Sequence, residues 1–188
     1  MIYKRFFDIV MSLCLIYILF PIIIIISILI RMESKGPAIF FSKRIGKNNK
    51  IFLMPKFRTM RHNTPQVATH LLKDSQRYVT KIGVFLRKSS IDEIPQIFSI
   101  LIGYMSFVGP RPALFNQYDL KNLREKKNIH LLTPGLTGWA QINGRDEISI
   151  PDKVQIELYY KENQSMLLDC KILLLTIFKV FKMKNINH

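Results

Sequence analysis

The chain has 188 residues, the size of one domain and too short for two domains with separate cores. Hydrophobic residues make up 48% of it, and 28 Lys and Arg residues against 13 Asp and Glu residues give a formal net charge of +15. Apolar content and positive charge that rise together argue against an ordinary soluble domain and favour a protein that works at a membrane beside an anionic ligand. Nucleic acid is the competing anion at this point.

Residues 9–30 form a run without a charged side chain, "IVMSLCLIYILFPIIIIISILI". As a straight helix the run would extend about 33 Å, enough to cross the hydrocarbon core of a bilayer. It is too long for the core of a signal peptide and no small-residue cleavage site follows it, so we expect it to be retained. A buried helix of a soluble protein is the alternative, which the apolar character of every face disfavours.

The flanks of this run and its proline bear on its topology. Basic residues lie on both sides of it, namely Lys4, Arg5, Arg31, Lys35, Lys43 and Arg44. The positive-inside rule would place both flanks in the cytoplasm, which a single crossing cannot satisfy. Pro21 removes a helix hydrogen bond near the middle and favours a kink. We therefore predict a re-entrant membrane helix in residues 1–35 that breaks at Pro21; a crossing helix with a tolerated proline is the alternative.

Residues 36–188 are predicted to form one integrated cytoplasmic domain. Two apolar stretches around a polar turn at 46–49 predict a β-hairpin within residues 38–60. Thr64 and Pro65 have the pattern of an N-cap followed by proline and predict a helix to about Arg77. A short helix is expected over residues 81–88, and the next helix should contain "SSIDEIPQ" and continue through "IPQIFSILI".

Three further segments follow in the C-terminal half. Residues 112–127 predict a charged surface helix, and "TPGLTGWAQINGR", residues 133–145, predicts a loop because it holds three glycines and a proline. The segment "LLDCKILLLTIFKVFKMK" mixes apolar residues and lysines at helical spacing, which is typical of an amphipathic helix in the headgroup region. A core-packing helix is the alternative there. The expected fold class is α+β and mostly helical: a small hairpin and amphipathic interfacial helices around a compact catalytic domain.

The two cysteines, Cys14 and Cys170, lie in apolar stretches without metal or redox spacing. We interpret them as buried thiols of a reducing compartment.

The stretch "SSIDEIPQ" sets Asp92 and Glu93 side by side in the most basic part of the chain. Residues 31–88 hold fourteen Lys and Arg against two acids, a local balance of +12. In a structural interpretation, Ser90 and Glu93 form a capping box and Asp92 adds negative charge near a helix N-terminus. In a catalytic interpretation, a carboxylate among basic side chains keeps a low pKa, stays ionised, and binds a divalent metal or attacks phosphorus. The pair itself permits both.

Attack on a pyrophosphate requires that its negative charge be neutralised. Basic residues in distinctive local settings are the candidates for this role: Lys56, Arg58, Arg87, Arg111 and Arg145. Any one of them could be a solvated surface charge, but the rigid Gly-Pro-Arg-Pro and Asn-Gly-Arg turns favour a functional role for Arg111 and Arg145. The four histidines show no metal-ligand spacing, which argues against zinc (His62, His70, His130, His188). Acidic residues with a hard metal are then the best available catalytic groups.

Several motifs, taken in order, resemble the bacterial sugar transferase family of small monotopic phosphoglycosyl transferases: "KRFFD", "SKGPAIFFSKRIGKNNK", "KFRTM", "FLRKSSIDEIPQIFSIL", "GYMSFVGPRP" and "TPGLTGWAQINGR". The resemblance runs from Tyr3 to Val180. It implies a re-entrant helix that holds the domain on the cytoplasmic face of the bacterial inner membrane. It also implies transfer of a sugar 1-phosphate from a UDP-sugar to a polyprenyl phosphate, typically undecaprenyl phosphate. The resemblance further implies that UMP is released, that Mg²⁺ is required and that the step begins glycoconjugate assembly.

The resemblance also implies roles for single residues. The aspartate of the family's Asp-Glu pair is the nucleophile, so Asp92 would form a phosphosugar-aspartyl intermediate, which the lipid phosphate then resolves, and would contact the metal. Glu93 would assist the metal or position the lipid phosphate. Arg87, Arg111 and Arg145 would hold phosphates. The remaining predicted substrate-binding residues are Pro110 and Pro112, which would shape the nucleotide pocket, and Gln141.

Two positions depart from the family pattern. Phe20 stands where a serine often precedes the proline of the helix break, and Tyr104 stands where "GDMS" has an acidic residue. If that acid supports the fold, tyrosine is a tolerated replacement; if it supports metal binding or an essential loop, activity is reduced.

The expected partners are a UDP-sugar, undecaprenyl phosphate, membrane lipids and downstream glycosyltransferases. The rival hypothesis is a catalytically idle membrane-bound scaffold that binds anionic lipid or partner enzymes. A nucleic-acid binder is disfavoured because the aromatic residues lie in apolar runs and not among the basic ones. The resemblance leaves the sugar open among N-acetylated amino or diamino sugars, galactose and glucose, and no residue of the sequence chooses among them.

Overall fold

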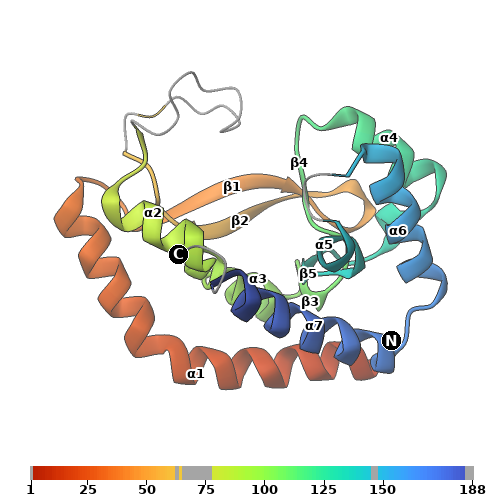
Figure 1. Cartoon of the computed structure of the whole chain (residues 1–188), viewed down its shortest axis with the longest axis horizontal. Coiled ribbons are helices and arrows are strands. Elements are labelled where there is room, and N and C mark those ends of the chain that lie inside the picture. Colours follow the sequence, from red (N-terminus) through yellow and green to blue (C-terminus); the bar gives the residue numbers. More distant parts are fainter. Residues whose placement is uncertain (1, 62–63, 65–77, 145–147, 185–188) are drawn as a thin grey trace.

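The computed structural model describes residues 2–61, 64, 78–144 and 148–184. Its elements, in chain order, are α1 (Ile2–Glu33), β1 (Ile39–Ile45), η1 (Lys47–Asn49), β2 (Ile51–Phe57), α2 (Lys81–Ser89), η4 (Ile91–Glu93), α3 (Gln96–Ile102), β3 (Ser106–Val108), β4 (Ala113–Leu114), α4 (Tyr118–Lys126), η5 (Ile129–Leu131), β5 (Gly135–Thr137), α5 (Trp139–Asn143), α6 (Ile150–Glu162) and α7 (Met166–Lys184). Helices surround two small sheets (Figure 1), so the predicted mostly helical α+β fold class is confirmed. The helix predicted from Thr64 to Arg77 falls almost entirely outside the described residues, and Arg145 lies outside them too.

Helix α1 is one continuous helix of 32 residues with Pro21 inside it, and it is bent into two arms (Figure 1). It is long and apolar enough to cross a membrane. Many of its large apolar side chains face outward, including Tyr17 at 85% exposed and Ile18 at 64%. The alternative of a buried helix in a soluble protein is therefore wrong, and α1 provides an apolar surface suited to lipid.

The N-terminal arm of α1 is fastened to the domain by charged side chains. The Asp8 carboxylate is buried and accepts hydrogen bonds from the backbone N–H of Phe107 (3.1 Å) and from the Ser106 hydroxyl (3.2 Å). Lys4 forms an ion pair with Asp169 at the start of α7. These contacts attach the beginning of α1 to β3 and α7.

The C-terminal end of α1 is fastened to a different part of the same domain. Ile26 and Ile30 pack with Phe57 and Leu86 in a buried apolar cluster. The Glu33 carboxylate accepts hydrogen bonds from two backbone N–H groups in the first turn of α2, at 2.6 and 3.0 Å, and such a carboxylate stabilises a helix N-terminus. Both ends of the bent helix thus contact one domain.

Strands β1 and β2 form the predicted hairpin, with antiparallel register from Ile39↔Phe57 to Ile45↔Ile51. The turn runs through Lys47–Asn49, where Asn48 and Asn49 adopt positive φ, a conformation that asparagine tolerates. Strand β4 pairs with β1 and extends the sheet to three strands.

The "TPGLTGWAQINGR" segment corrects the prediction of a loop, because it contains β5 and α5. Strand β5 pairs in parallel with β3, and the two backbones approach closely. A Cβ on Gly135 would lie 2.1 Å from the backbone nitrogen of Gly109, so only glycine permits this approach. The glycines of this segment therefore permit the close packing of two strands as well as turns of the backbone.

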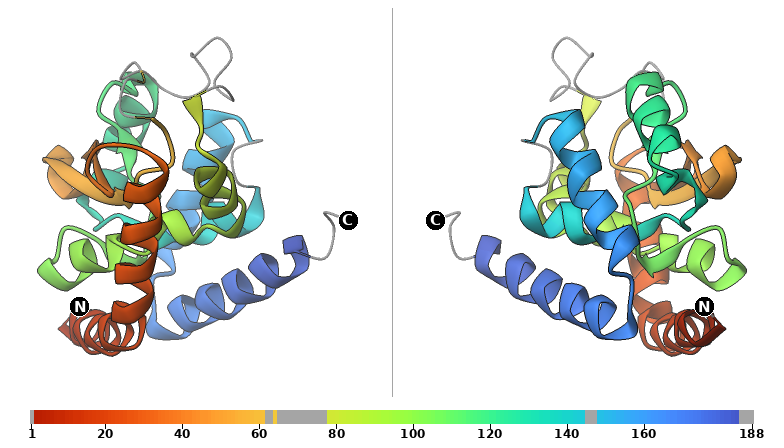
Figure 2. Two further views of the ribbon diagram at one scale, coloured as in Figure 1. Left: turned by 90° about the vertical axis from the view of Figure 1, so that its left-hand side faces the viewer. Right: turned by 90° about the vertical axis from the view of Figure 1, so that its right-hand side faces the viewer.

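Two helices of the C-terminal half match the predictions in part. The charged helix predicted over 112–127 is shorter, since α4 covers Tyr118–Lys126 and β4 precedes it. Helix α7 buries Ile172 and Asp169 but exposes Leu174, Ile177 and Phe178, so it packs on the core along one side and offers apolar residues on the other. Figure 2 shows α7 leaving the domain at the end of the molecule where the N-terminal arm of α1 lies. Helix α7 thus packs on the core, as the core-packing alternative expected, and also exposes the apolar side chains that an amphipathic helix would have.

The two cysteines are exposed in the structure, so the prediction of buried thiols is wrong. Cys14 lies on α1 and Cys170 on α7. Their apolar neighbours in sequence lie on both sides of these helices: Leu13 and Leu167 are exposed, whereas Leu15 and Ile172 pack in the core. Apolar context alone therefore does not decide whether a cysteine is buried.

Candidate active site

Three segments far apart in the sequence bring opposite charges together. Lys56 lies near the end of β2, Asp92 and Glu93 form most of η4, and Arg111 lies between β3 and β4. Lys56 Nζ is 2.7 Å from Glu93 Oε1 and 3.8 Å from Asp92 Oδ2, and Arg111 Nη2 is 3.1 Å from Glu93 Oε1. The two carboxylates thus share one lysine, and Glu93 also holds an arginine.

The backbone around the carboxylates differs from both the predicted helix and the predicted capping box. Helix α2 ends at Ser89, Ser90 adopts the left-handed conformation (φ 58°), and a single 3₁₀ turn carries Asp92 and Glu93 before α3 begins. The side chain of Ser90 makes no capping hydrogen bond to this turn, and the side chain of Glu93 is directed to Lys56 and Arg111. The structural interpretation of the pair as a capping box is therefore wrong.

The environment shifts the pKa values of the two carboxyl groups in opposite directions. Burial raises the pKa of Asp92, and the charge of Glu93 raises it further, although Lys56 and Arg87 act against both. Burial also acts to raise the pKa of Glu93, but Arg111 and Lys56 outweigh it and the pKa falls. The expectation that basic neighbours hold the pKa of Asp92 low is thus wrong. Opposite shifts in adjacent carboxyl groups are typical of groups with different chemical roles.

A small pocket of about 10 Å³ opens beside Glu93, lined by Arg44, Met54, Glu93, Gln96, Arg111, Pro112 and Gly135. Burial, together with the charge of Arg111, lowers the pKa of Arg44 to about 10. The sequence analysis missed Arg44 and Gln96 as pocket residues. The hairpin register could have found Arg44, because residues on alternate positions of paired strands share a face and Arg44 lies on the face of Lys56.

The other predicted substrate-binding residues occupy varied positions. Arg87 Nε donates to the Thr59 hydroxyl (2.9 Å), and its charge acts on Asp92, so it lies near the pair. Arg58 does not join it: its buried guanidinium donates to the carbonyls of Lys35 (2.6 Å) and Ser34 (2.7 Å) just beyond the end of α1.

Pro112 lines the pocket beside Glu93, whereas Pro110 and Gln141 are not among the residues that line it. The carbonyl of Pro110 accepts from the N–H of Gly135 (2.9 Å), and that of Pro112 accepts from Arg44 (3.3 Å). The Gln141 amide nitrogen is 3.5 Å from the carbonyl of Leu136. Tyr104, the departure from the family pattern, is 55% exposed, and its ring lies 5.9 Å from that of Phe52.

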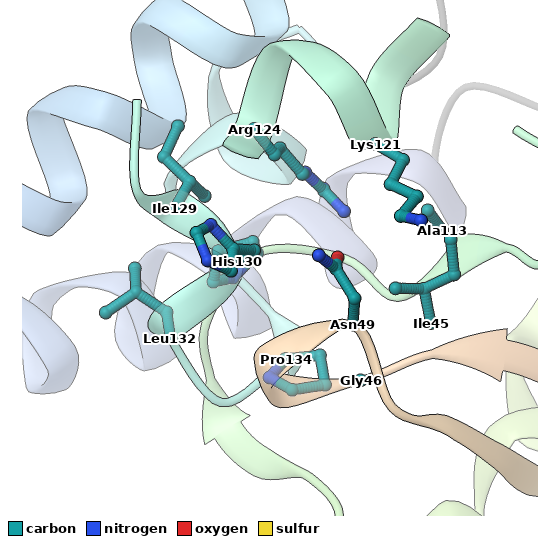
Figure 3. A pocket seen from close by; sticks show the side chains of 11 residues that line it. Ile45, Gly46, Asn49, Ala113, Lys121, Arg124, Ile129, His130, Leu132 and Pro134 are labelled. Atoms are coloured by element: carbon teal, nitrogen blue, oxygen red, sulfur yellow. The ribbon is translucent and has the colours of Figure 1, made fainter. Parts of the chain in front are cut away.

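A second hollow, of about 20 Å³, is shown in Figure 3. It is lined by Ile45, Gly46, Asn49, Pro110, Ala113, Lys121, Arg124, Ile129, His130, Leu132 and Pro134. Pro110 and Ala113 line this hollow and Pro112 lines the pocket beside Glu93, so the short segment 110–113 borders both.

The carboxylate oxygens of Asp92 and Glu93 are of the ligand type that a magnesium ion prefers. No cluster of three or more His, Cys, Asp or Glu side chains suited to a metal occurs among the described residues. Mg²⁺ does not need such a cluster, because it binds through one or two protein carboxylates when substrate phosphates and water complete its octahedral shell. Asp92 and Glu93, adjacent on one turn, provide such a pair.

Comparison with known proteins places this geometry in context. The chain is 40% identical over its whole length to an uncharacterised sugar transferase of Bacillus subtilis, EpsL, and spans 92% of that protein. It is 39% identical, over 96% of its length, to a UDP-glucose:undecaprenyl-phosphate glucose-1-phosphate transferase of Klebsiella pneumoniae, of which it spans 40%. It is 36% identical, over 93% of its length, to a UDP-N-acetylgalactosamine-undecaprenyl-phosphate N-acetylgalactosaminephosphotransferase of Aeromonas hydrophila, of which it spans 42%.

The chain therefore covers nearly all of the Bacillus relative and about two fifths of the two longer transferases. The profile of the bacterial sugar transferases matches residues 1–183, which include every element that builds the pair of carboxylates and its basic partners. The chain belongs to the bacterial sugar transferase family.

Proposed function

We propose that this protein transfers a sugar 1-phosphate from a UDP-sugar to undecaprenyl phosphate and releases UMP. The observation that carries the proposal is the Asp92-Glu93 pair held between Lys56 and Arg111, in a chain that matches the family over nearly its whole length. Relatives named for this reaction use glucose in one case and N-acetylgalactosamine in another, so the sugar stays open.

The chemistry proceeds in two steps. A carboxylate oxygen of Asp92 attacks the phosphorus that bears the sugar; an O–P bond forms, the bridging P–O bond breaks, and its electron pair leaves with UMP. An oxygen of the lipid phosphate then attacks the same phosphorus, and the Asp92 carboxylate departs. Two anionic substrates never need to react directly with each other, and UMP leaves before the lipid phosphate enters.

The raised pKa of Asp92 suits this role. A carboxylate of higher pKa is more basic and more nucleophilic once it is ionised. Glu93 keeps its charge because its pKa is lowered, and it holds Lys56 and Arg111 in place. These two cations, with Arg87 nearby, would neutralise the charge of the pyrophosphate as it is displaced.

Asp92 and Glu93 would hold Mg²⁺ together with the phosphates of the donor. When bound, the ion withdraws charge from the phosphoryl oxygens and lowers the barrier to attack.

We further propose that α1 is re-entrant, that the domain lies on the cytoplasmic face of the inner membrane, and that lipids cover the exposed apolar residues of α1. Two observations support this topology. Both ends of the bent helix contact the same domain, and basic residues flank the apolar run on both sides. A helix that crossed the bilayer would separate these ends by the thickness of the membrane.

The proposed function is tested by UMP release from purified protein with Mg²⁺, undecaprenyl phosphate and a panel of donors that includes UDP-glucose, UDP-galactose and UDP-N-acetylgalactosamine. We expect release with at least one donor. Asp92→Asn should abolish it, whereas Asp119→Asn, an exposed aspartate on α4, should not. Absence of release with every donor would contradict the proposal and favour an idle scaffold that binds anionic lipid or partner enzymes.

A further inference from the structure

A buried ion pair lies behind the turn that carries Arg111. Arg124 on α4 binds Glu157 on α6 through two hydrogen bonds, Nε to Oε2 at 2.8 Å and Nη2 to Oε1 at 2.5 Å. The two side chains are 9% and 2% exposed. The same Nη2 also donates to the backbone carbonyl of Arg111, at 2.9 Å. One guanidinium thus connects α4, α6 and the candidate active site.

The packing of α4 on α6 does not itself require this pair. Leu120 of α4 and Val154 of α6 belong to one buried apolar cluster, which also contains Ile129 of η5. A buried ion pair is commonly no more stabilising than apolar side chains of similar size, because desolvation offsets its attraction. The third contact, to the carbonyl of Arg111, therefore indicates a role beyond stability.

The segment 110–112 depends on its carbonyls for a fixed position. Pro110 and Pro112 have no N–H group to donate. Their carbonyls accept from Gly135 and Arg44, and the carbonyl between them accepts from Arg124. Figure 3 shows Arg124 extending from α4 into the hollow that this segment borders. Three different elements thus hold three successive carbonyls.

We propose that the Arg124–Glu157 pair positions the backbone of Arg111 so that the guanidinium of Arg111 reaches Glu93. Glu157 orients the guanidinium of Arg124, and Arg124 holds the carbonyl of Arg111. Both are positioning residues, because neither touches the carboxylate pair in the described structure. The catalytic consequence rests on the proposed function, whereas the structural part can be measured without any substrate.

Two variants separate positioning from folding. Arg124→Met with Glu157→Leu replaces the ion pair by apolar side chains, leaves no buried charge unpaired, and is expected to fold. Arg124→Lys keeps a charge for Glu157 but lacks the fork that binds two acceptors at once. The matched control is Lys161→Met, because Lys161 also joins α6 to the end of α4, through the carbonyl of Lys127 (2.8 Å), away from residues 110–112.

Hydrogen exchange of the full chain in detergent tests the positioning directly. In the double variant and in Arg124→Lys we expect the amides of peptides covering residues 106–116 to exchange about tenfold faster, while peptides of α4 and α6 stay within about twofold of the wild type. Lys161→Met should leave residues 106–116 unchanged. Unchanged exchange in both Arg124 variants would overturn the proposal, and so would a general loosening of α4 and α6 with no selective effect on the turn.

A double-mutant cycle with Arg111→Met tests the catalytic consequence. If Arg124 acts through Arg111, Arg124→Met with Glu157→Leu lowers kcat/KM for the UDP-sugar about tenfold or more when Arg111 is present. The same pair of substitutions has little further effect when it is combined with Arg111→Met. Equal losses in both backgrounds would indicate a merely structural role and overturn the proposal. An inactive wild type would instead contradict the proposed function, and hydrogen exchange would still decide the positioning.

Discussion

Asp92 and Glu93 are neighbours in the chain and yet face different surroundings. Glu93 accepts two charged hydrogen bonds, from Lys56 and Arg111, whereas Asp92 lies 3.8 Å from Lys56. Burial affects both, but only Glu93 has enough opposite charge close by to reverse its effect on the pKa. A difference of this kind lets one carboxylate organise the site while the other reacts.

Replacement of Lys56 tests this electrostatic arrangement. Lys56 lowers the pKa of Asp92, so Lys56→Met should raise that pKa further. Asp92 attacks only when it is ionised. As the pH is lowered, Lys56→Met should therefore lose activity at a higher pH than the wild type does. Its kcat/KM near neutrality should also drop on the order of 10²-fold. The measurement is the pH profile of kcat/KM for the donor.

Lys43→Met is the matched control for this profile, because Lys43 is exposed on the same hairpin and belongs to its opposite face. Its acidic limb should coincide with that of the wild type. An unshifted limb in Lys56→Met would show that Lys56 does not set the pKa of the reacting group.

Ser90 offers a test of the local backbone. It has a positive φ and no capping hydrogen bond from its side chain to η4, so glycine should fit better at this position. We expect Ser90→Gly to leave the free energy of unfolding unchanged or to raise it by up to about 1 kcal/mol. The measurement is thermal or denaturant unfolding in detergent, with Lys88→Gly, at an exposed position within α2, as the destabilising comparison.

At the scale of elements, the sequence predicted those features that local rules decide. Two apolar stretches around the polar turn at Gly46 to Asn49 predicted the hairpin, and apolar residues and lysines at helical spacing predicted the helix later seen as α7. Strand β5 was missed because its stability comes from contact between Gly135 and Gly109, which are far apart in the chain. The 3₁₀ turn at Asp92 was missed because the side chain of Glu93 bonds to Lys56 and Arg111, which are distant in sequence.

The two docked ends of α1 lead to a prediction about topology. If the helix enters and leaves on one side, a cysteine introduced at Ile2 in a Cys14→Ser, Cys170→Ser background should react only with reagents that reach the cytoplasmic face. A cysteine in place of exposed Lys43 marks the domain and should show the same sidedness. The measurement is labelling by an impermeant maleimide in intact and in opened cells. Labelling of position 2 in intact cells, with position 43 protected, would contradict re-entry.

At the scale of the whole molecule, membrane anchor and candidate site share one framework. Glu33, at the end of α1, caps the first turn of α2, and α2 carries Arg87 and leads into the turn with Asp92. On the other side, Asp8 accepts hydrogen bonds from residues of β3, whose chain continues into the segment with Arg111. The helix that we assign to the lipid thus supports both sides of the charged cluster.

Some of the site residues could be found from sequence, and others could not. Lys56, Asp92, Glu93 and Arg111 stand in distinctive motifs, and the fold brings them together. Arg58 stands in an equally distinctive motif but serves the end of α1, a role that only the tertiary structure reveals. Arg44 lies within the long motif of residues 34–50 but was noted only as one of six basic flanking residues, because its place in the pocket depends on strand register.

The most direct test of the central claim is mass spectrometry of quenched protein after reaction with a proven UDP-sugar donor and Mg²⁺ in the absence of undecaprenyl phosphate. We predict that the tryptic peptide that begins at Ser89, after Lys88, gains the mass of one sugar phosphate. Asp119→Asn should retain this adduct, and Asp92→Asn should lack it. Release of UMP from a proven donor with no adduct on that peptide, or an adduct that persists in Asp92→Asn, would contradict the account.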